Sequence, residues 1–390
     1  MTTVLHAFRR GAWRTSADRA PLPGAPDREL SLVPEIVADA DRRRWQSTLP
    51  GLPPLTGRRE LLLTALELFD RGTLTVGGIG GQSADAFRAA LWESAGLPSP
   101  LVDRWCGMLR SGLLAQGEAP APDESLALVA LPGNTFTCLE SVCEQAERSA
   151  GVWVRPSRRE PLSAARFVAA LLAAGWPPAR VGFYPGARPS LKGLVRLTDR
   201  QIVYGGAGLA AAVRDSPGLT LHGPGRGCAL VPADMPTGEA VSWLLPLVAA
   251  DAGRFCSNVR TVICAEPDRT EPLARALAAA LDALAPDGEW PLTAFREPGA
   301  AERAARAVRD RLRPGDRVLT GRPPGPPFTE DQRATPQLVL LADHLADASS
   351  LPHPLIGYEV PYPFAAVLGA SREAERAITA ESLFVYRPAK

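Results

Sequence analysis

The spacing of apolar residues divides the chain into a helical N-terminal part and a longer part in which strands and helices alternate. Leucines recur at helical spacing over residues 58–70, and similar patterns predict helices over 84–94 and 101–114. From residue 125, short apolar runs predict strands at 126–131, 152–154, 181–184 and 201–204, with helices at 138–150, 162–174 and 209–213. This alternation indicates an α/β fold with a doubly wound parallel sheet.

A second block of the same kind begins after residue 221. Strands are expected at 228–231, 259–264, 317–320, 338–341 and 363–368, and helices at 239–252, 273–284 and 301–312. We therefore expect two domains, 1–222 and 223–390. Residues 1–56, rich in Arg and Pro, show little periodicity and are expected to wrap over the first domain, and the glycines of 77–81 are interpreted as a turn.

Composition removes several classes of function. The 390 residues include 43 basic and 42 acidic side chains, a balance that argues against wholesale binding to nucleic acid or to a membrane surface. The longest strongly apolar stretch, 240–250, has about half of the ~20 residues that a membrane span needs, and Pro246 interrupts it. The N-terminus lacks a secretory apolar region. A reduced, cytoplasmic enzyme is the expected class.

Cysteine is the candidate for chemistry. The six cysteines show no Cys-x-x-Cys pair and no metal-like clustering with the four histidines, so no metal site is expected. Cys256 follows Gly253 at a junction between a helix-like segment and a β-branched run, where a thiol can be presented as a nucleophile. A lone cysteine is more often structural, and Cys138, Cys143, Cys228 and Cys264 are expected in the core.

Short motifs in a fixed order strengthen the case for Cys256. Together they resemble the aldehyde dehydrogenase superfamily over roughly residues 60–385. The matching segments are Pro-Gly-Asn at 132–134, Val-Arg-Pro-Ser at 154–157, Ala-Gly-Trp-Pro-Pro at 174–178, Val-Tyr-Gly-Gly at 203–206, Gly-Arg-Phe-Cys at 253–256 and Glu-Val-Pro-Tyr-Pro at 359–363.

The resemblance implies a Rossmann-type cofactor domain, a smaller α/β catalytic domain and a role for each motif. Cys256 matches the family's nucleophile, and Asn134 its oxyanion-hole amide. Gly205 and Gly206 match the segment beside the cofactor phosphates, whereas Glu359 matches the carboxylate that binds the nicotinamide ribose. Rival interpretations exist, because Asn134 and the glycines are common turn residues and Glu359 could be an ordinary surface carboxylate.

One departure from the family concerns the general base. Aldehyde oxidisers carry a glutamate that activates water, but residues 221–227 contain no carboxylate, and His222 falls at that place. In this respect the chain resembles the branch that reduces acyl thioesters, including long-chain acyl-CoA reductases. The prediction is reduction of an acyl thioester, carried by CoA or a carrier protein, to an aldehyde. The alternatives are aldehyde oxidation with His222 as the acid/base, and a scaffold without turnover; His222 could also merely fill the vacated volume.

Two further departures concern the cofactor and the chain end. NAD-specific members place a glutamate three residues after the lysine of the cofactor strand. This chain has Arg155-Pro156-Ser157-Arg158-Arg159 there, with two arginines where an acid would repel a 2′-phosphate. Arginines favour NADPH because guanidinium binds phosphate in a bidentate way, although NADH is possible and the arginines could simply be solvated. Only residues 360–390 follow Glu359. The oligomerisation arm of the family is therefore expected to be shortened or absent, which leaves the oligomeric state open. Arginine-rich segments at 42–44 and 303–313 could contact CoA or a carrier protein, or be solvated faces.

Overall fold

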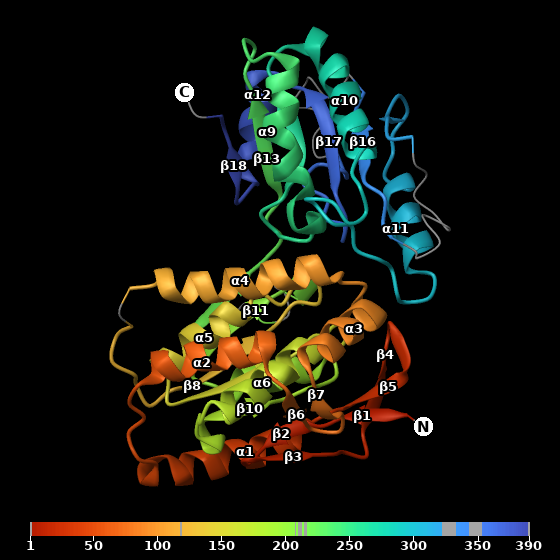
Figure 1. The fold of residues 1–390 in the computed structure, drawn as a ribbon. Coiled ribbons are helices and arrows are strands. Elements are labelled where there is room, and N and C mark those ends of the chain that lie inside the picture. Colours follow the sequence, from red (N-terminus) through yellow and green to blue (C-terminus); the bar gives the residue numbers. More distant parts are fainter. Residues whose placement is uncertain are drawn as a thin grey trace. The chain divides into compact units, whose positions relative to one another are not determined.

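The computed structural model describes residues 2–117, 119–206, 208–209, 213, 217–321, 333–342 and 353–388. The chain divides into two compact units, Met1–Gly223 (unit 1) and Pro224–Lys390 (unit 2). Each unit is built around its own sheet and its own apolar core (Figure 1). Among the described residues, no helix combines the length and apolar character needed to cross a membrane.

Unit 1 is organised around a seven-stranded sheet with the order β12-β11-β8-β9-β10-β2-β3. Five adjacent strands, from the edge strand β12 to β10, are parallel: β8 (Leu126–Ala130), β9 (Gly151–Arg155), β10 (Val181–Phe183), β11 (Arg200–Tyr204) and β12 (Leu219–His222). Every residue of β8 is buried, as expected for a parallel strand covered on both faces. The doubly wound α/β architecture expected from the sequence is confirmed.

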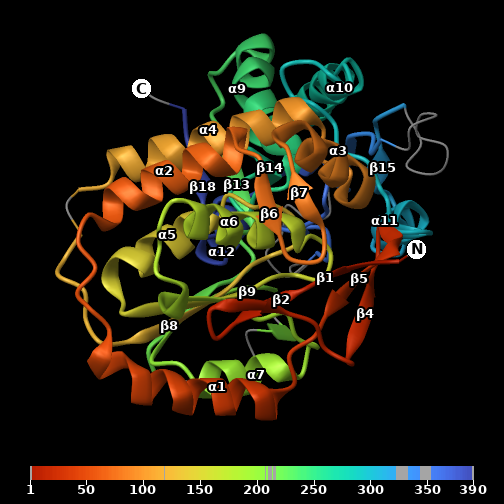
Figure 2. The same cartoon turned by 60° about the horizontal axis from the view of Figure 1, so that its bottom comes forward.

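Helices cover both faces of this sheet. On one face α1 (Glu35–Thr48) and α7 (Ser190–Arg196) pack against Leu126, Leu128 and Trp153, and Figure 2 shows these two helices side by side. The opposite face is covered by a layer that includes α5 (Leu139–Arg148) and α6 (Leu162–Ala173), over which lie α2 (Arg58–Arg71), α3 (Ala84–Ala95) and α4 (Ser99–Ala115). The five helices expected between residues 58 and 174 are thus confirmed as α2 to α6. Helix α7 was not predicted.

The first 56 residues correct the sequence analysis. They form five short strands and α1, not an irregular wrap. β2 (Ala7–Arg9) and β3 (Ala12–Arg14) extend the main sheet in antiparallel fashion, whereas β1 (Thr3–Leu5), β4 (Arg19–Leu22) and β5 (Ala25–Ser31) form a separate sheet. Most of these strands have three or four residues, too few for alternation to be visible, and Pro21 adjoins a register shift.

The glycine-rich segment after α2 is a turn, as expected, but it joins two strands that were missed, β6 (Leu74–Val76) and β7 (Gly80–Gln82). Arg166 of α6 holds this hairpin to α2. Its buried guanidinium donates to the carbonyl oxygens of Phe69 (2.7 Å), Gly72 (2.6 Å) and Gln82 (3.0 Å). These bonds satisfy a charge that would otherwise be costly to bury.

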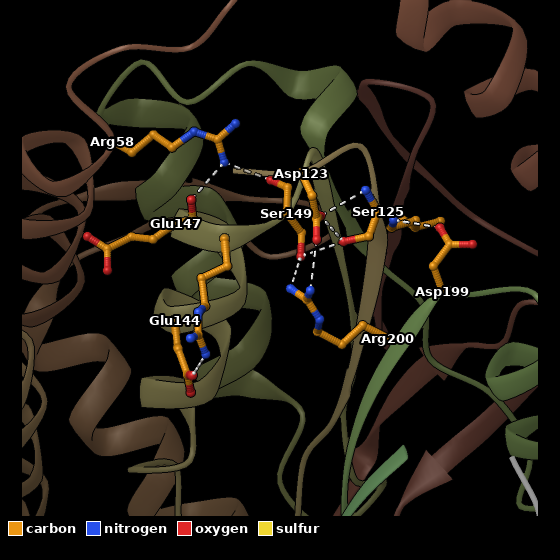
Figure 3. A network of polar contacts seen from close by, with 10 residues as sticks. Arg58, Asp123, Ser125, Glu144, Glu147, Ser149, Asp199 and Arg200 are labelled. Carbon is orange, nitrogen blue, oxygen red and sulfur yellow. Dashed lines mark hydrogen bonds and ion pairs between the residues drawn. The ribbon is translucent and has the colours of Figure 1, made fainter. Parts of the chain in front are cut away.

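At the amino ends of the parallel strands, arginines meet oxygen atoms (Figure 3). Arg58 donates to the carbonyl oxygens of Ala146 (2.6 Å) and Ser149 (2.7 Å), which closes the last turn of α5. This cation at a helix C-terminus also complements the helix dipole. We call this part of the sheet, residues 123–126, 146–151 and 198–200, the amino edge.

Carboxylates complete the amino edge. Asp123 pairs with Arg200 (2.8 Å) and hydrogen-bonds Ser125, and Asp199 accepts the backbone N–H of Leu126 (2.8 Å) while pairing with Arg42 (2.7 Å). Arg200 and Arg42 are therefore neutralised within the fold.

Unit 2 has a six-stranded sheet with the order β15-β16-β17-β14-β13-β18. Its strands are β13 (Gly227–Val231), β14 (Val259–Cys264), β15 (Arg317–Val318), β16 (Gln337–Leu340), β17 (Phe364–Gly369) and β18 (Val385–Tyr386), and every pairing except β15 with β16 is parallel.

Helices flank this second sheet as well. One core contains α9 (Thr237–Ala249) and α10 (Pro267–Asp282), and the other contains α11 (Ala300–Arg309) and α12 (Arg372–Ala380). The expected strands and three helices of this block are confirmed, whereas β12 in unit 1 and α12 and β18 here were missed. The helix expected over 209–213 falls largely outside the described residues.

Candidate active site

Cys256 lies on the turn between α9 and β14. All six cysteines are described, and Cys256 is the exposed one: Cys106, Cys143, Cys228 and Cys264 are buried, and Cys138 is half-buried. The helix was expected to continue to residue 252, but α9 ends at Ala249, and Asp251 and Ala252 take left-handed φ values of 54° and 55°. Such values are strained for residues other than glycine, and they redirect the chain toward the turn.

Two buried side chains fix this turn. Asn258 accepts the backbone N–H of Phe255 (2.8 Å) and donates to the carbonyl oxygens of Leu247 (3.2 Å) and Ala250 (3.1 Å). The turn is therefore tied to the end of α9 directly in front of β14. None of these three bonds was foreseen from the sequence, because Asn258 has no motif of its own.

Arg260 provides the second anchor. Its guanidinium donates to the carbonyl oxygens of Gly253, Tyr362 (3.1 Å) and Val360 (3.2 Å). It is 2% exposed, and burial lowers its pKa to about 10. One side chain thus joins the Cys256 turn to the segment that carries Glu359.

Glu359 reaches the Cys256 turn through Gly225. The backbone N–H of Gly225 donates to Oε1 of Glu359 (2.8 Å). A Cβ on Gly225 would overlap the carbonyl oxygen of Cys256, so the backbones of residues 225 and 256 touch where no side chain would fit. The residues predicted as nucleophile and ribose ligand are therefore neighbours in unit 2.

The surroundings of Cys256 raise the pKa of its thiol. Burial of the sulfur raises its pKa, and the negative charge of Glu359 raises it further. The backbone N–H groups of Cys256 and Ser257 and the cation of Arg260 lower the pKa, but they do not compensate. The Cys256 thiol is therefore a weaker acid than an ordinary cysteine, and removal of the charge on Glu359 would lower its pKa.

Tyr386 of β18 supports the same turn from another side. Its hydroxyl donates to the carbonyl oxygen of Ser257 (2.8 Å). Burial raises the pKa of the phenol, and Cys256 contributes in the same direction. Pattern analysis gave no signal for this residue, because its strand has only two residues.

The remaining predicted site residues lie in unit 1, at the carboxyl ends of the parallel strands, which we call the carboxyl edge (131–135, 155–159, 184–188 and 204–206). Asn134 follows β8, and the neighbouring Gly133 has no room for a side chain, because a Cβ would meet the hydroxyl of Ser157 after β9. Ligands of open α/β sheets bind at such an edge.

Arginines gather at this edge without acidic partners. Arg155, Arg158, Arg159 and Arg188 form no ion pair with any described carboxylate. Arg155 donates weakly to the carbonyl oxygens of Gly186 (3.4 Å) and Ala187 (3.3 Å). Burial, followed by repulsion from Arg158, lowers the pKa of Arg155 to about 10, and its buried Nε has no described hydrogen-bond partner.

Gly205 and Gly206 follow β11 at the same edge. A Cβ on Gly205 would collide with Leu209, whereas a Cβ on Gly206 would meet no atom of the described residues. Open backbone at a strand end, unpaired guanidinium groups and an orphaned Nε suit a ligand that carries phosphate groups. The residues present therefore fit a nicotinamide dinucleotide.

His222 ends β12, next to Tyr204 at the end of β11. The two rings are stacked, with centroids 4.5 Å apart and an angle of 12° between the planes. The tyrosine was not singled out by the sequence analysis. Within the described residues, no group of three or more His, Cys, Asp or Glu side chains could hold a metal ion.

Comparisons with known proteins agree on the fold. No protein-family model matches the chain, and no curated protein matches its sequence. Solved structures do match. A mutant of aldehyde dehydrogenase C from Pseudomonas syringae, complexed with NAD+ and octanal, aligns with a TM-score of 0.76 at 14% identity over 100% of this chain and 85% of that one.

Two further structures give the same result. Methylmalonate-semialdehyde dehydrogenase from Oceanimonas doudoroffii has a TM-score of 0.74 at 14% identity, covering 100% of this chain and 86% of its own. NADP-dependent glyceraldehyde-3-phosphate dehydrogenase from Bacillus halodurans, complexed with NADP, has a TM-score of 0.72 at 14% identity, with 99% and 91% covered. The chain therefore has the aldehyde dehydrogenase fold over its whole length.

Proposed function

We propose that the chain is an NADP(H)-dependent oxidoreductase that reduces an acyl thioester to an aldehyde through a thioacyl intermediate on Cys256. The observation that carries this proposal is the presentation of Cys256. It is the exposed cysteine on a turn fixed by Asn258 and Arg260, in a chain with the aldehyde dehydrogenase fold. A structural cysteine would not need such support.

His222 favours a thioester over water chemistry. The end of β12 carries an imidazole where an aldehyde oxidiser would need a carboxylate to activate water. A thiol has an ordinary pKa of about 8.5, far closer to that of imidazole, about 6.5, than water is. An imidazole is therefore matched to a sulfur acid or base.

The mechanism assigns one task to each residue. Sγ of Cys256 attacks the thioester carbon, and the carrier thiol leaves to give the thioacyl enzyme. The amide of Asn134 and the backbone N–H of Cys256 stabilise the oxyanion, and loss of one such donor typically costs about 10²–10³ in kcat. Bound NADPH supplies the hydride that reduces the acyl carbon. Collapse of the resulting thiohemiacetal on Cys256 then releases the aldehyde.

The same proposal assigns the carboxyl edge of unit 1 to the cofactor. Arg155, Ser157 and Arg158 would bind the 2′-phosphate end, Gly205 and Gly206 the pyrophosphate, and Glu359 of unit 2 the nicotinamide ribose. The support is the unpaired arginines, because a guanidinium without a carboxylate is free for phosphate. The acyl carrier, CoA or a carrier protein, is the partner of this reaction.

Aldehyde oxidation is the second candidate function. The specific observation in its favour is the activity for which the structural neighbours are named, since they are dehydrogenases of aldehydes. In that case His222 would activate water, and the thioacyl enzyme would be hydrolysed to an acid.

Intact-protein mass spectrometry separates these functions. The protein is mixed with acyl-CoAs and acyl carrier proteins, the adduct is mapped by peptide digestion, and NADPH is then added. An adduct on Cys256 that disappears with release of aldehyde supports the reductase, and Cys256→Ser should form none. Absence of an adduct, combined with NADP+-dependent acid formation from aldehydes, would leave the oxidiser. If neither an adduct nor acid formation were detected, a scaffold without turnover would be the remaining function.

A further inference from the structure

Residues 383–386, which lead into β18 and form it, run beside the turn that carries Cys256. The backbone N–H of Leu383 donates to the carbonyl oxygen of Gly225 (2.9 Å), the residue whose backbone touches that turn. The hydroxyl of Tyr386 donates to the turn itself (2.8 Å). Both ends of this segment are therefore fixed next to the candidate nucleophile by contacts inside unit 2.

Phe384 brings an aromatic ring to the same place. A Cβ on Gly225 would overlap the carbonyl oxygen of Cys256 and would lie 2.9 Å from a ring carbon of Phe384. The ring and the backbone of the nucleophile thus meet at one glycine. Phe384 is half-buried, so part of its ring stays open to solvent.

Leu383 extends this apolar surface into solvent. Its side chain is 68% exposed. A single exposed leucine ordinarily needs no explanation, but exposed apolar side chains that adjoin one another mark places where ligands bind. Here Leu383 and Phe384 are consecutive, and both contact Gly225 beside the thiol-bearing turn.

The polar side chains on either side of this segment are satisfied by one another. Arg226 pairs with Glu381 (2.7 Å), and the hydroxyl of Ser382 donates to the carbonyl oxygen of Ile378 (2.9 Å). Glu359, the other charged neighbour of Gly225, accepts its backbone N–H (2.8 Å). An apolar group that covers Leu383 and Phe384 therefore breaks none of these contacts.

We propose that Leu383 and Phe384 are specificity-determining residues, on which the acyl chain attached to Cys256 lies, so that long apolar acyl groups are preferred to short ones. The inference rests on the proposed function, because it requires an acyl group on Cys256. It deepens that function by naming the class of acyl group and the residues that select it.

The size of the preference follows from the methylene groups that leave water. An acyl carbon bonded to Sγ of Cys256 holds the start of its chain a few bonds from the thiol. Each further methylene that is fully buried strengthens binding about fourfold, and roughly twofold where one side of the chain stays in water. The contact makes and breaks no covalent bond, so it selects the thioester without altering the chemical step.

The test measures the second-order rate of Cys256 acylation by acetyl-, hexanoyl- and dodecanoyl-CoA, using rapid quench and intact-protein mass spectrometry. We expect dodecanoyl-CoA to react at least about 30-fold faster than acetyl-CoA in the wild type. Leu383→Ser should slow the dodecanoyl reaction about tenfold, the lower end of the effect of a changed apolar contact, and leave the acetyl reaction within about twofold.

Two further variants complete the set. Phe384→Leu keeps an apolar side chain with less area and should slow the dodecanoyl reaction about threefold. Val318→Ser is the matched control, because Val318 is an exposed apolar residue (39%) on β15, at the opposite edge of the same sheet. It should react like the wild type with all three thioesters.

A second probe reports on the surface without thioester chemistry. Alkylation of Cys256 by N-methylmaleimide and N-octylmaleimide is followed by peptide mapping, with Cys256→Ser as the blank. The octyl reagent should react about tenfold faster with the wild type, after correction for its reaction with a small thiol. Leu383→Ser should lose most of this advantage.

Each outcome decides the inference. Equal acylation by short and long chains, or a chain-length preference that Leu383→Ser and Phe384→Leu leave intact, would overturn it while the proposed function stands. A shift of Leu383→Ser to a smaller oligomer, with the preference retained, would assign the surface to a second copy of the chain and overturn it too. If no thioester acylates the wild type, the proposed function fails. A Leu383-dependent preference for the octyl reagent would then still support an apolar binding surface beside Cys256, and its absence would remove that surface as well.

Discussion

The two edges of the sheet in unit 1 both carry arginines, but they differ in what those arginines face. At the amino edge Arg58 bonds to helix carbonyls and Arg200 pairs with Asp123 (Figure 3). Arg42 pairs with Asp199 at the same edge. At the carboxyl edge Arg155 and Arg158 face no described carboxylate. The first set holds the fold together, and the second forms no ion pair within the described part of the chain.

The largest effect is expected at the amino edge. Arg58→Ala should lower the free energy of unfolding by roughly 2–3 kcal/mol, because it leaves carbonyl oxygens at the end of α5 without their charged donor. Urea unfolding followed by tryptophan fluorescence measures this loss. The affinity of the folded variant for nucleotide should be unchanged. A selective loss of NADPH binding would contradict the assignment of a purely structural role to the arginines of the amino edge.

The next effect is expected at the carboxyl edge. Arg158→Ala should weaken NADPH binding about 10- to 100-fold, the value of a charge-assisted contact to phosphate, and leave NADH binding unaltered. Fluorescence titration with both nucleotides gives the comparison. Arg196→Ala, which removes an exposed arginine paired with Glu35, is the matched control. If Arg158→Ala lowered the midpoint of urea unfolding as much as Arg58→Ala does, Arg158 would be shown to stabilise the fold.

In unit 2, unlike at the carboxyl edge of unit 1, a carboxylate does lie near a candidate reactive group: Glu359 acts on the thiol of Cys256. Glu359→Gln removes a negative charge that raises the pKa of Cys256, so the thiolate should form at lower pH. The pH profile of Cys256 alkylation by iodoacetamide should move to lower pH by about one unit, the smaller end of the effect of a nearby charge. An unmoved profile would mean that Glu359 does not act on the thiol.

The smallest effect is expected from Arg148→Ala, also near the amino edge. Arg148 pairs with Glu144 one turn away on α5, and both side chains are about 40% exposed, at 43% and 40%. Such a pair contributes only about 0.3–0.5 kcal/mol. A loss comparable to that of Arg58→Ala in the same urea assay would show that burial does not distinguish the arginines of this edge.

The sequence predicted the repetitive parts of both sheets well, because a buried parallel strand such as β8 and a helix such as α2 carry a long apolar signal. It missed β2 and β18, whose few residues give no periodicity, and it extended α9 past the left-handed residues at 251 and 252.

The candidate site was predictable only as separate segments. Motifs pointed to Cys256 and Glu359, but their contact depends on Gly225, and the support of the turn depends on Asn258 and Tyr386. Some of these contacts join residues that are far apart in the sequence, and the others are made by single polar side chains that belong to no periodic pattern. The spacing of residues along the chain therefore does not predict them. The roles of Asn134 and His222 stay predictions until acylation rates of their variants are measured.

Arg260 has a consequence for how the protein would respond to ligands. The guanidinium of Arg260 hydrogen-bonds both the turn of Cys256 and the segment of Glu359. A molecule that displaces one of these two segments would therefore also change the position of the other. Binding of a ligand at Glu359 and reversible binding of an inhibitor beside Cys256 would then be energetically coupled, and the coupling must be reciprocal. An inhibitor that binds reversibly beside the thiol would alter the affinity of the ligand at Glu359 by the same factor by which that ligand alters the affinity of the inhibitor.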